Sequence, residues 1–404
     1  MKNRVVITGS GIVSSIGLGI DAFKKSIFNG VNGISRITRF DSDKVNCKSA
    51  AEVKNFDFSA FNIQSSGFYD RYSQFGIVSA KEALSNANLT IGETYDIERT
   101  AVVFGTGIGG IETQEKGYEK LFIQNGKRLH PFTVPKAIPS AAASLISLEL
   151  GITGPCFGVT SACSSSGHAI IQSYYMLASG LVDMVITGGA EAPISYGVVK
   201  AWEGMRVLAS DYCRPFSHKR GGTILGEGGG TLVLETLDAA LERNAPILAE
   251  IVGVGMSSDA FHPVKPHLEG PIRSMNQAIN HAGIRNNVIN YINAHGTGTH
   301  LNDMNETLAI KSVFDTNAHK IAVSSTKSMH GHTLGASSAV EAIATILSLN
   351  HQVIPPTINF VPGDDVCDLD YVPNHSRASQ IDFALCNSFA FGGLNTSILF
   401  KSYY

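Results

Sequence analysis

One cysteine and two histidines stand in sequence contexts where their side chains could do chemistry. Cys163 lies in SACSSSG (161–167), directly before a predicted helix that ends near Gly180. A thiol at a helix N-terminus lies near unpaired backbone N–H groups and the positive end of the helix dipole, which favour a thiolate and can hold an oxyanion. The alternative is a buried, inert cysteine. The small, hydroxylated neighbours favour the nucleophile, but Cys163 alone leaves both interpretations open.

The two histidines strengthen the catalytic interpretation. His295 lies in NAHGTGT (293–299), after a predicted strand at 289–292, and His332 lies in KSMHGHT (327–333), before a second predicted long helix. Both positions are turns from strand to helix, where open α/β sheets bind their ligands. A single histidine is more often structural, but two histidines and a cysteine at comparable turns indicate a catalytic group.

The elements that must hold these residues are alternating strands and helices. Short runs rich in β-branched residues are each followed by Gly or Ser and then by a helical pattern, most clearly after 4–9, 100–105, 183–189 and 230–235. This pattern is typical of an α/β chain with buried strands. No Pro-rich or Ser-rich linker divides the chain, so any domains must be tightly fused.

The same order of motifs occurs twice along the chain. A strand that ends in Gly-Thr-Gly appears at 104–110 and again at 294–299, and each copy is followed by a Ser/Gly-rich turn that opens a long apolar helix. We therefore predict an internal duplication, with an N-terminal half at 1–250 that carries the cysteine and a C-terminal half at 251–404 that carries both histidines.

Composition excludes several classes of function. Among 404 residues, 31 Lys or Arg and 34 Asp or Glu give a formal charge of −3, which provides no basic surface for a nucleic acid. No apolar run reaches the roughly 18 residues that a membrane helix needs, and the start is unlike a signal peptide, so we expect a cytoplasmic protein. The six cysteines form no CxxC pair, which argues against a zinc site and a disulfide framework.

Four sequence blocks, taken in order, resemble one enzyme family. They are SACSSSG (161–167), NAHGTGT (293–299) with Asp303 and Glu306 behind it, KSMHGHTLGA (327–336) and NSFAFGG (387–393). They resemble the condensing enzymes of the thiolase fold, and most closely the β-ketoacyl-acyl carrier protein synthases that elongate chains. The resemblance extends over essentially the whole chain and implies a duplicated αβαβα architecture of five layers.

The resemblance implies a catalytic Cys-His-His group. Cys163 would accept the acyl group from an acyl carrier protein as a thioester. His295 and His332 would bind the malonyl thioester, promote loss of CO2 and stabilise the enolate. A neutral imidazole suits this task because its N–H stabilises an enolate oxygen without protonating the carbanion. A thiolate is both a nucleophile and a good leaving group.

Four further side chains would support this group. Lys327 and Glu341 resemble the family's structural lysine and its companion acid, and Asp303 and Glu306 could orient groups by hydrogen bonds. The resemblance implies no metal and no free cofactor, because the substrates are carried on the phosphopantetheine of acyl carrier protein.

The resemblance also assigns residues around the substrate. The backbone N–H groups of Cys163 and Phe389 would form an oxyanion hole, and Phe389 would gate access between the acyl and malonyl steps. Ile108 would shape the acyl pocket, together with Trp202. An ordinary core position is the alternative for Ile108.

The partner surfaces follow from the same resemblance. Lys127, Arg128 and Arg206 resemble positions that meet the acidic carrier protein, although charged residues more often form only a solvated surface. Because the family completes its acyl tunnel at a two-fold interface, we expect a homodimer or a heterodimer with a related chain.

The blocks also separate related proteins. A thiolase would carry a second reactive cysteine where this chain has Asn387-Ser388-Phe389, and a chain-initiating synthase would have Asn at the position of His332. The presence of Cys163 argues against a non-catalytic, length-setting subunit of a heterodimer, which stays as the alternative. Fatty acid, polyketide and polyene pathways of the dissociated (type II) kind all remain open.

Two unrelated functions match short motifs. The spacing of Gly105, Gly107 and Gly110 matches a dinucleotide-binding loop, but no acidic residue closes a second strand about 20 residues later. His330 and His332 have a spacing that zinc sites use, but they lack a third ligand at a suitable distance in sequence.

Overall fold

The computed structural model describes residues 3–61, 63 and 66–403. Within these residues, an eleven-stranded mixed sheet forms the centre of an α/β protein. Along the sheet the strands follow the order β11 (Ala322–Ser324), β10 (Tyr291–Asn293), β14 (Phe383–Ala390), β15 (Leu394–Lys401), β9 (Ala249–Ser258), β1 (Val5–Ser14), β8 (Gly228–Thr236), β7 (Met184–Glu191), β5 (Thr100–Gly105) and β6 (Cys156–Val159), with β2 (Gly17–Leu18) paired to β1.

The sheet has the same strand order on either side of the pairing between β9 and β1. Outward from this pairing, β1-β8-β7-β5-β6 corresponds to β9-β15-β14-β10-β11. The directions correspond too, since β5 runs parallel to its neighbours β6 and β7, and β10 runs parallel to β11 and β14. The division into halves at 1–250 and 251–404 stays a prediction; residue 250 is the second residue of β9.

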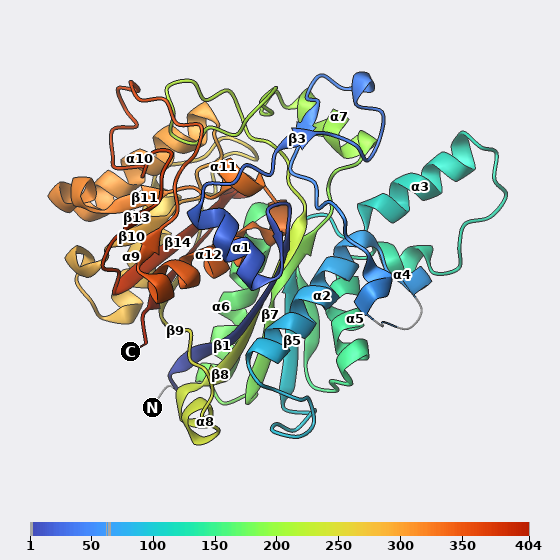
Figure 1. Ribbon diagram of the computed structural model, residues 1–404, viewed down its shortest axis with the longest axis horizontal. Helices are drawn as coiled ribbons and strands as arrows, with labels where there is room; N and C mark the ends of the chain where they lie inside the picture. The colour runs from blue at the N-terminus through green and yellow to red at the C-terminus, as the bar shows by residue number, and fades with distance from the viewer. Residues whose placement is uncertain (1–2, 62, 64–65, 404) are drawn as a thin grey trace.

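Helices form three layers around the two halves of the sheet. In Figure 1, α9 (Glu269–Ala282) and α10 (His300–Phe314) lie on one side, α12 (Ser337–His351) and α6 (Ser165–Ala178) in the middle, and α2 (Arg71–Asn86) and α5 (Ala141–Leu150) on the other side. The middle helices contact both halves: α6 packs on β5 and β7 and reaches β15, and α12 packs on β14 and on β8. This is the five-layer αβαβα arrangement of the thiolase fold.

The sequence explains why these elements are buried. Strands β1 and β7 are buried along their whole length, as expected for strands with helices on both faces. Helix α12 has the composition SSAVEAIATILSLNH, and its residues from Ser337 to Leu349 are all buried. A helix that is small and apolar on every side belongs in a core rather than at a surface, so α12 can lie between two sheets.

The remaining elements cover the ends and edges of this core. They are α1 (Ile20–Phe28), α3 (Ile111–Phe122), α4 (Thr133–Ala137), α7 (Tyr196–Gly204), α8 (Leu237–Glu242), α11 (Lys327–His330), and the short strands β3 (Ser35–Arg36), β4 (Ser49–Ala50), β12 (Val353–Ile354) and β13 (Arg377–Ala378). Figure 1 shows α3 and the loop after it extending away from the body. Across the described part of the chain, no helix has the length and apolar character needed to span a bilayer.

Candidate active site

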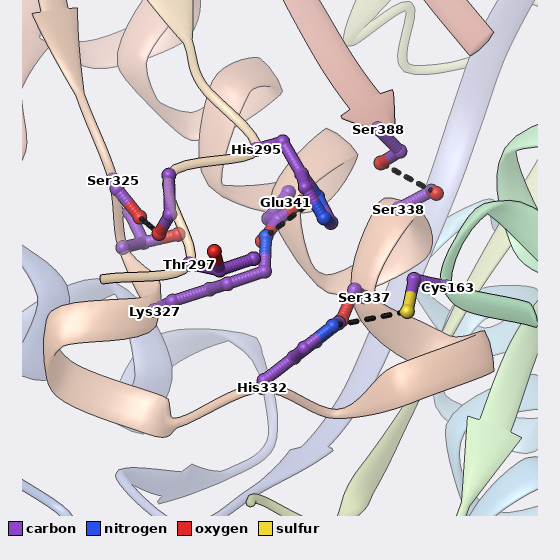
Figure 2. Close-up of polar contacts among 12 residues, drawn as sticks. Cys163, His295, Thr297, Ser325, Lys327, His332, Ser337, Ser338, Glu341 and Ser388 are labelled. Atoms are coloured by element: carbon purple, nitrogen blue, oxygen red, sulfur yellow. Dashed lines mark hydrogen bonds and ion pairs between the residues drawn. The ribbon is translucent and has the colours of Figure 1, made fainter. Parts of the chain in front are cut away.

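Cys163 lies in the 3-10 turn Ala162–Ser164, which leads directly into α6. Its side chain is 4% exposed. The Sγ atom lies 3.1 Å from Nε2 of His332, and Figure 2 shows the imidazole pointing at the sulfur. The structure therefore brings together two residues that are 169 positions apart in the sequence.

The protonation of Cys163 differs from the expectation that its helix N-terminus favours a thiolate. Burial raises the pKa of the thiol to about 12, although Lys327 and a hydrogen bond from the backbone N–H of Phe391 lower it in part. Removal from water outweighs these favourable contacts, so the resting side chain is a thiol at neutral pH. A nucleophilic role then requires that the thiol lose its proton as the substrate reacts. The Nε2 atom of His332 lies within hydrogen-bond distance of the sulfur.

His295 follows β10 and lies beside His332. The two ring centroids are 5.5 Å apart and the planes are nearly perpendicular, at 83°. Glu306 on α10 accepts hydrogen bonds from the backbone N–H groups of His295 (2.8 Å) and Gly296 (2.7 Å), which fixes the turn. The Nζ atom of Lys327 lies 3.3 Å from Nδ1 of His295.

His332 is held by its backbone and by its ring. It lies between α11 and α12, where its N–H donates to the carbonyl of Ile224 (2.7 Å) and its carbonyl accepts from the N–H of Gly226 (2.9 Å). On the ring, Nδ1 lies 2.8 Å from the hydroxyl of Ser337, the first residue of α12. Both ring nitrogens of His332 are therefore engaged, one by Ser337 and one by Cys163.

Both imidazoles are neutral at neutral pH. Burial, and next the positive charge of Lys327, holds the pKa of His295 and of His332 well below the usual range. A neutral imidazole has one N–H donor and one acceptor nitrogen. Each ring can therefore donate a hydrogen bond to a substrate oxygen without being a strong acid.

Lys327 forms an ion pair with Glu341 on α12, and both side chains are completely buried. Burial raises the pKa of Glu341 to about 7 against the opposite effect of Lys327. Among the described residues, Oε2 of Glu341 has no hydrogen-bond partner. The pair lies behind His295 (Figure 2), so the ammonium group is available as a donor to that ring.

Asp303 on α10 supports the same turn through backbone hydrogen bonds. Its carboxylate accepts from the backbone N–H groups of Phe216 (2.7 Å) and Gly298 (3.2 Å). Burial raises the pKa of Asp303 to about 6 and that of Glu306 to about 7, against the lowering effect of these backbone donors. Both carboxyl groups contact the backbone of the 293–299 turn rather than the sulfur.

A cavity of about 470 Å³ opens onto the three central residues. Its walls include Cys163, His295, His332, Trp202, Arg206, Thr297, Thr299, Phe389, Ala390 and Phe391. The Trp202 ring lies 6.4 Å from the ring of His332 and 5.7 Å from that of Phe391. Ile108 is not part of this wall; it packs in the same apolar cluster as Trp202.

The backbone group that acts on the thiol of Cys163 belongs to Phe391, and the oxyanion hole expected from Cys163 and Phe389 stays a prediction. The backbone N–H of Phe391 lowers the pKa of the Cys163 thiol. Phe389 lies two residues earlier, inside β14, with its ring 6.2 Å from that of His295. Phe391 lies outside this strand, because β14 ends at Ala390 and the chain then turns in the 3-10 segment Phe391–Gly393.

The three basic residues expected to meet a carrier protein do not all lie at the cavity. Arg206 is exposed and forms part of the cavity wall. Lys127 and Arg128 are exposed on the segment between α3 and α4, and neither contributes to that wall. Within this one chain, only Arg206 of the three lies at the entrance.

Glu191, at the end of β7, is a site residue that the sequence analysis missed. Its buried carboxylate accepts from the N–H groups of Gly107 (2.6 Å), Ile108 (3.3 Å) and Gly335 (2.9 Å) and from the hydroxyl of Thr106 (2.8 Å). It therefore joins the turn that carries Ile108 to the turn after His332. An acid in the otherwise apolar and glycine-rich run VITGGAE was the available signal.

The same contacts account for the glycine motif at 105–110. In a dinucleotide-binding loop the backbone N–H groups face a phosphate, whereas here the Glu191 carboxylate occupies those of Gly107 and Ile108. His330 bonds to the carbonyl of Gly331 and to the hydroxyl of Thr326. Among the described residues, no three His, Cys, Asp or Glu side chains lie close enough to share a metal ion.

Known proteins are similar in sequence to this chain over nearly its whole length. The "Beta-ketoacyl synthase, N-terminal domain" model matches residues 2–240, and the "Beta-ketoacyl synthase, C-terminal domain" model matches residues 248–361. Nodulation protein E of Rhizobium meliloti (strain 1021) is 42% identical and covers 99% of this chain and 100% of its own. The 3-oxoacyl-[acyl-carrier-protein] synthase 2 of Staphylococcus aureus (strain COL) is 40% identical and covers 100% of this chain and 99% of its own.

Solved structures agree with these relatives. The ishigamide ketosynthase/chain length factor matches 100% of both chains with a TM-score of 0.96 at 33% identity. A type II PKS acyl-carrier protein in complex with its ketosynthase, bound to the hexaketide, matches 100% of both chains with a TM-score of 0.91 at 29% identity. The chain therefore belongs to the β-ketoacyl synthase family and is a condensing enzyme of the acyltransferase class with the thiolase fold.

Proposed function

We propose that this chain is a 3-oxoacyl-[acyl-carrier-protein] synthase of a dissociated fatty acid, polyketide or polyene pathway. It extends an acyl chain held on Cys163 by decarboxylative condensation with a malonyl group on acyl carrier protein. One observation carries the proposal: the Cys163 sulfur lies 3.1 Å from Nε2 of His332, with the His295 ring facing the same cavity. A nucleophile and two neutral N–H donors in one pocket are what this reaction needs.

The first step loads the acyl chain. The sulfur of Cys163 attacks the carbonyl carbon of the acyl thioester, and its thiol proton passes to the departing sulfur of the carrier. The backbone N–H groups of Cys163 and Phe391 stabilise the oxyanion, in place of the pair with Phe389 expected from the sequence. The carrier leaves as a thiol, so the enzyme holds a thioester and both imidazoles stay neutral.

The second step forms the carbon–carbon bond. The malonyl carboxylate leaves as CO2, and its electron pair forms an enolate whose oxygen accepts hydrogen bonds from His295 and His332. Lys327 donates to Nδ1 of His295 and so keeps the proton of that ring on Nε2, facing the substrate. The enolate carbon attacks the thioester, and the sulfur of Cys163 leaves as a thiolate, which then takes a proton from solvent.

The substrates arrive on acyl carrier protein, so the proposal includes no free cofactor and no metal. Arg206 at the cavity entrance, together with Lys127 and Arg128, is proposed to meet the acidic carrier. Attraction between exposed charges is screened over about 10 Å at ordinary ionic strength, so this docking is salt-dependent. Ile108 and Trp202 are proposed to shape the acyl end of the pocket, and the cytoplasmic location expected from the sequence belongs to the same proposal.

A two-subunit assembly, of identical or related chains, completes the proposal. Its support is the apolar surface of the segment formed by α3 and α4, where Phe122 is 78% and Val134 is 69% exposed. The neighbouring strand β6 lies at an edge of the sheet and carries the partly exposed Phe157. Exposed apolar patches and open strand edges favour association with a second chain.

The non-catalytic alternative is not favoured, because Cys163, His295 and His332 are all present and meet in one cavity. Incubation of the purified protein with acyl and malonyl carrier protein thioesters should give a 3-oxoacyl product two carbons longer, detected by mass spectrometry. Cys163→Ala should abolish this product, whereas Cys213→Ala, which removes another buried thiol, should keep it. Equal product from wild type and Cys163→Ala would overturn the proposal.

A further inference from the structure

The hydroxyl of Ser337 is the only side-chain group within hydrogen-bond distance of Nδ1 of His332 among the described residues. Ser337 begins α12 and is completely buried. Figure 2 shows its hydroxyl beside the imidazole ring of His332. The partner of Nδ1 decides which nitrogen of a neutral imidazole carries the proton, so Ser337 bears directly on what Nε2 presents to the cavity.

The direction of this hydrogen bond follows from a second hydroxyl. The Thr333 hydroxyl, also buried, lies 3.3 Å from that of Ser337 and has no other hydrogen-bond partner in the described part of the chain. A buried hydroxyl proton without an acceptor is costly. The proton of Thr333 therefore points to the Ser337 oxygen, and the proton of Ser337 points to Nδ1 of His332.

This order leaves Nδ1 of His332 as an acceptor and places the ring proton on Nε2. The neighbouring ring reaches the same state by different chemistry, because Nδ1 of His295 faces the ammonium group of Lys327, which can only donate. Both imidazoles then present an N–H group to the cavity. For His295 a charged donor fixes the tautomer, and for His332 a neutral hydroxyl does so.

We propose that Ser337 is a positioning residue that holds His332 in the tautomer protonated on Nε2, with Thr333 orienting the Ser337 hydroxyl. The inference rests on the proposed role of His332 as a donor to the enolate oxygen. Ser337 would thereby keep the Nε2 proton of His332 available to the enolate oxygen during decarboxylation. The sequence gives no sign of this role, since Ser337 reads as one more small residue at a helix start.

The test uses three variants of the full-length enzyme. Ser337→Ala removes the donor, Ser337→Thr keeps a hydroxyl at the same position, and Ser338→Ala is the matched control. Ser338 is the next residue of α12 and is also buried, but its hydroxyl donates to Ser388 rather than to an imidazole. Comparison of the two alanine variants separates loss of a buried hydroxyl from loss of the contact with His332.

The first readout is the ¹⁵N NMR spectrum of histidine-labelled protein, with His332 assigned by loss of its signals in His332→Gln. We expect the wild type and Ser338→Ala to show the proton on Nε2, and Ser337→Ala to show a mixture of tautomers. This measurement needs no substrate, so it tests Ser337 even if the proposed reaction fails. Wild-type His332 protonated on Nδ1, or an unchanged tautomer in Ser337→Ala, would overturn the inference.

The second readout is release of CO2 from malonyl carrier protein. Complete general acid–base contributions reach 10²–10⁴-fold, so partial loss of the correct tautomer should lower kcat about tenfold in Ser337→Ala while KM stays the same. Ser337→Thr should recover most of this loss. A fall in Ser338→Ala equal to that in Ser337→Ala would assign the effect to helix packing and contradict a specific role for Ser337.

Discussion

At the scale of the residue, burial sets the protonation state of the Cys163 sulfur and of the two imidazole rings. Burial disfavours charge, which keeps His295 and His332 neutral and ready to donate hydrogen bonds. The same burial makes Cys163 a weak acid, with a pKa raised to about 12. The nucleophile is therefore formed when a proton acceptor and a substrate are both present, rather than stored as a thiolate.

This view predicts how Cys163 reacts with iodoacetamide. Because the thiolate is the reactive form, the alkylation rate of resting enzyme should rise by about tenfold for each pH unit between pH 7 and 9, without a plateau. Peptide mass spectrometry after short exposures measures the rate at Cys163 alone. A rate that is already constant below pH 7 would mean that a stable thiolate exists and that the helix N-terminus outweighs burial.

The pair of Lys327 and Glu341 gives a second prediction at this scale. Removing one partner of a buried ion pair leaves an uncompensated charge and costs about 3–5 kcal/mol, so Glu341→Leu should lower the free energy of unfolding by that amount in urea titrations. The double variant Lys327→Met, Glu341→Leu should recover most of the stability. It should stay inactive, because His295 has lost the donor at Nδ1; full activity of the double variant would contradict the role given to Lys327.

At the scale of the element, the site depends on turns from both halves of the sheet being held in register. Glu191 at the end of β7 bonds to the turn at 106–108 in the first half and to Gly335 in the second. These two turns are so close that a Cβ atom on Gly335 would lie 2.1 Å from the backbone nitrogen of Gly107. Because Gly107 and Gly335 have no side chains, the two turns can approach closely. The Glu191 carboxylate can therefore bond to both the turn that carries Ile108 and the turn after His332.

The titration of Glu191 gives a pH-dependent prediction. Burial raises its pKa from 4.5 in the unfolded chain to about 7 in the folded protein. Between these values the folded protein keeps a proton that the unfolded chain has lost, so this group lowers stability as pH rises, by about 1.4 kcal/mol per unit. Glu191→Gln has no such proton, so its stability relative to wild type should improve from pH 5 to pH 7.

Urea unfolding at several pH values measures this difference. The exposed Glu242→Gln is a suitable control and should follow the wild type at every pH. If Glu191→Gln instead loses stability relative to wild type as pH rises, the carboxylate is stabilised as an anion by its four donors and burial is not the dominant effect.

At the scale of the whole molecule, the repeated strand order brings residues from distant parts of the chain to one place. Cys163 follows β6 and His332 follows β11, which occupy corresponding positions in the two halves of the sheet. His295 follows β10, whose counterpart is β5. Helices α6 and α12 pack against each other between the two halves of the sheet. The catalytic group is thus a consequence of the duplicated order rather than of any single segment.

The exposed segment of α3 and α4 gives a prediction about assembly. Phe122→Asp should weaken self-association, because it places a charge in an apolar contact; a loss of 1.4 kcal/mol or more would raise the dissociation constant at least about tenfold. Sedimentation velocity measures it. Leu241→Asp on α8 is the control, since Leu241 is 51% exposed but lies on another face. Equal weakening by both variants, or by neither, would remove this segment from the proposed interface.

The sequence predicted the parts of the site that depend on local pattern. Each strand-to-helix turn can be recognised from its local sequence. Because such turns bind ligands in open α/β sheets, Cys163, His295 and His332 could be expected to lie close together. The parts that depend on packing could not be predicted. Whether Phe389 or Phe391 faces the sulfur depends on where β14 ends, and the acidity of Cys163 depends on burial by both halves.

Contacts between residues far apart in the sequence could not be predicted either. Glu191 and Gly335 are 144 positions apart, and no local spacing links them. The role of Ser337 is hidden for another reason: serine at the start of a helix is common, and only the position of the His332 ring gives its hydroxyl a partner.

The proposed reaction depends most on Cys163 carrying the growing chain, and one measurement tests this directly. The enzyme is mixed with acyl carrier protein thioester alone and its mass is followed before and after malonyl carrier protein is added. We predict one acyl group on the peptide that contains Cys163, and its disappearance at the rate at which the 3-oxoacyl product forms. Product formed at the full rate with no acyl group ever found on that peptide would contradict the account.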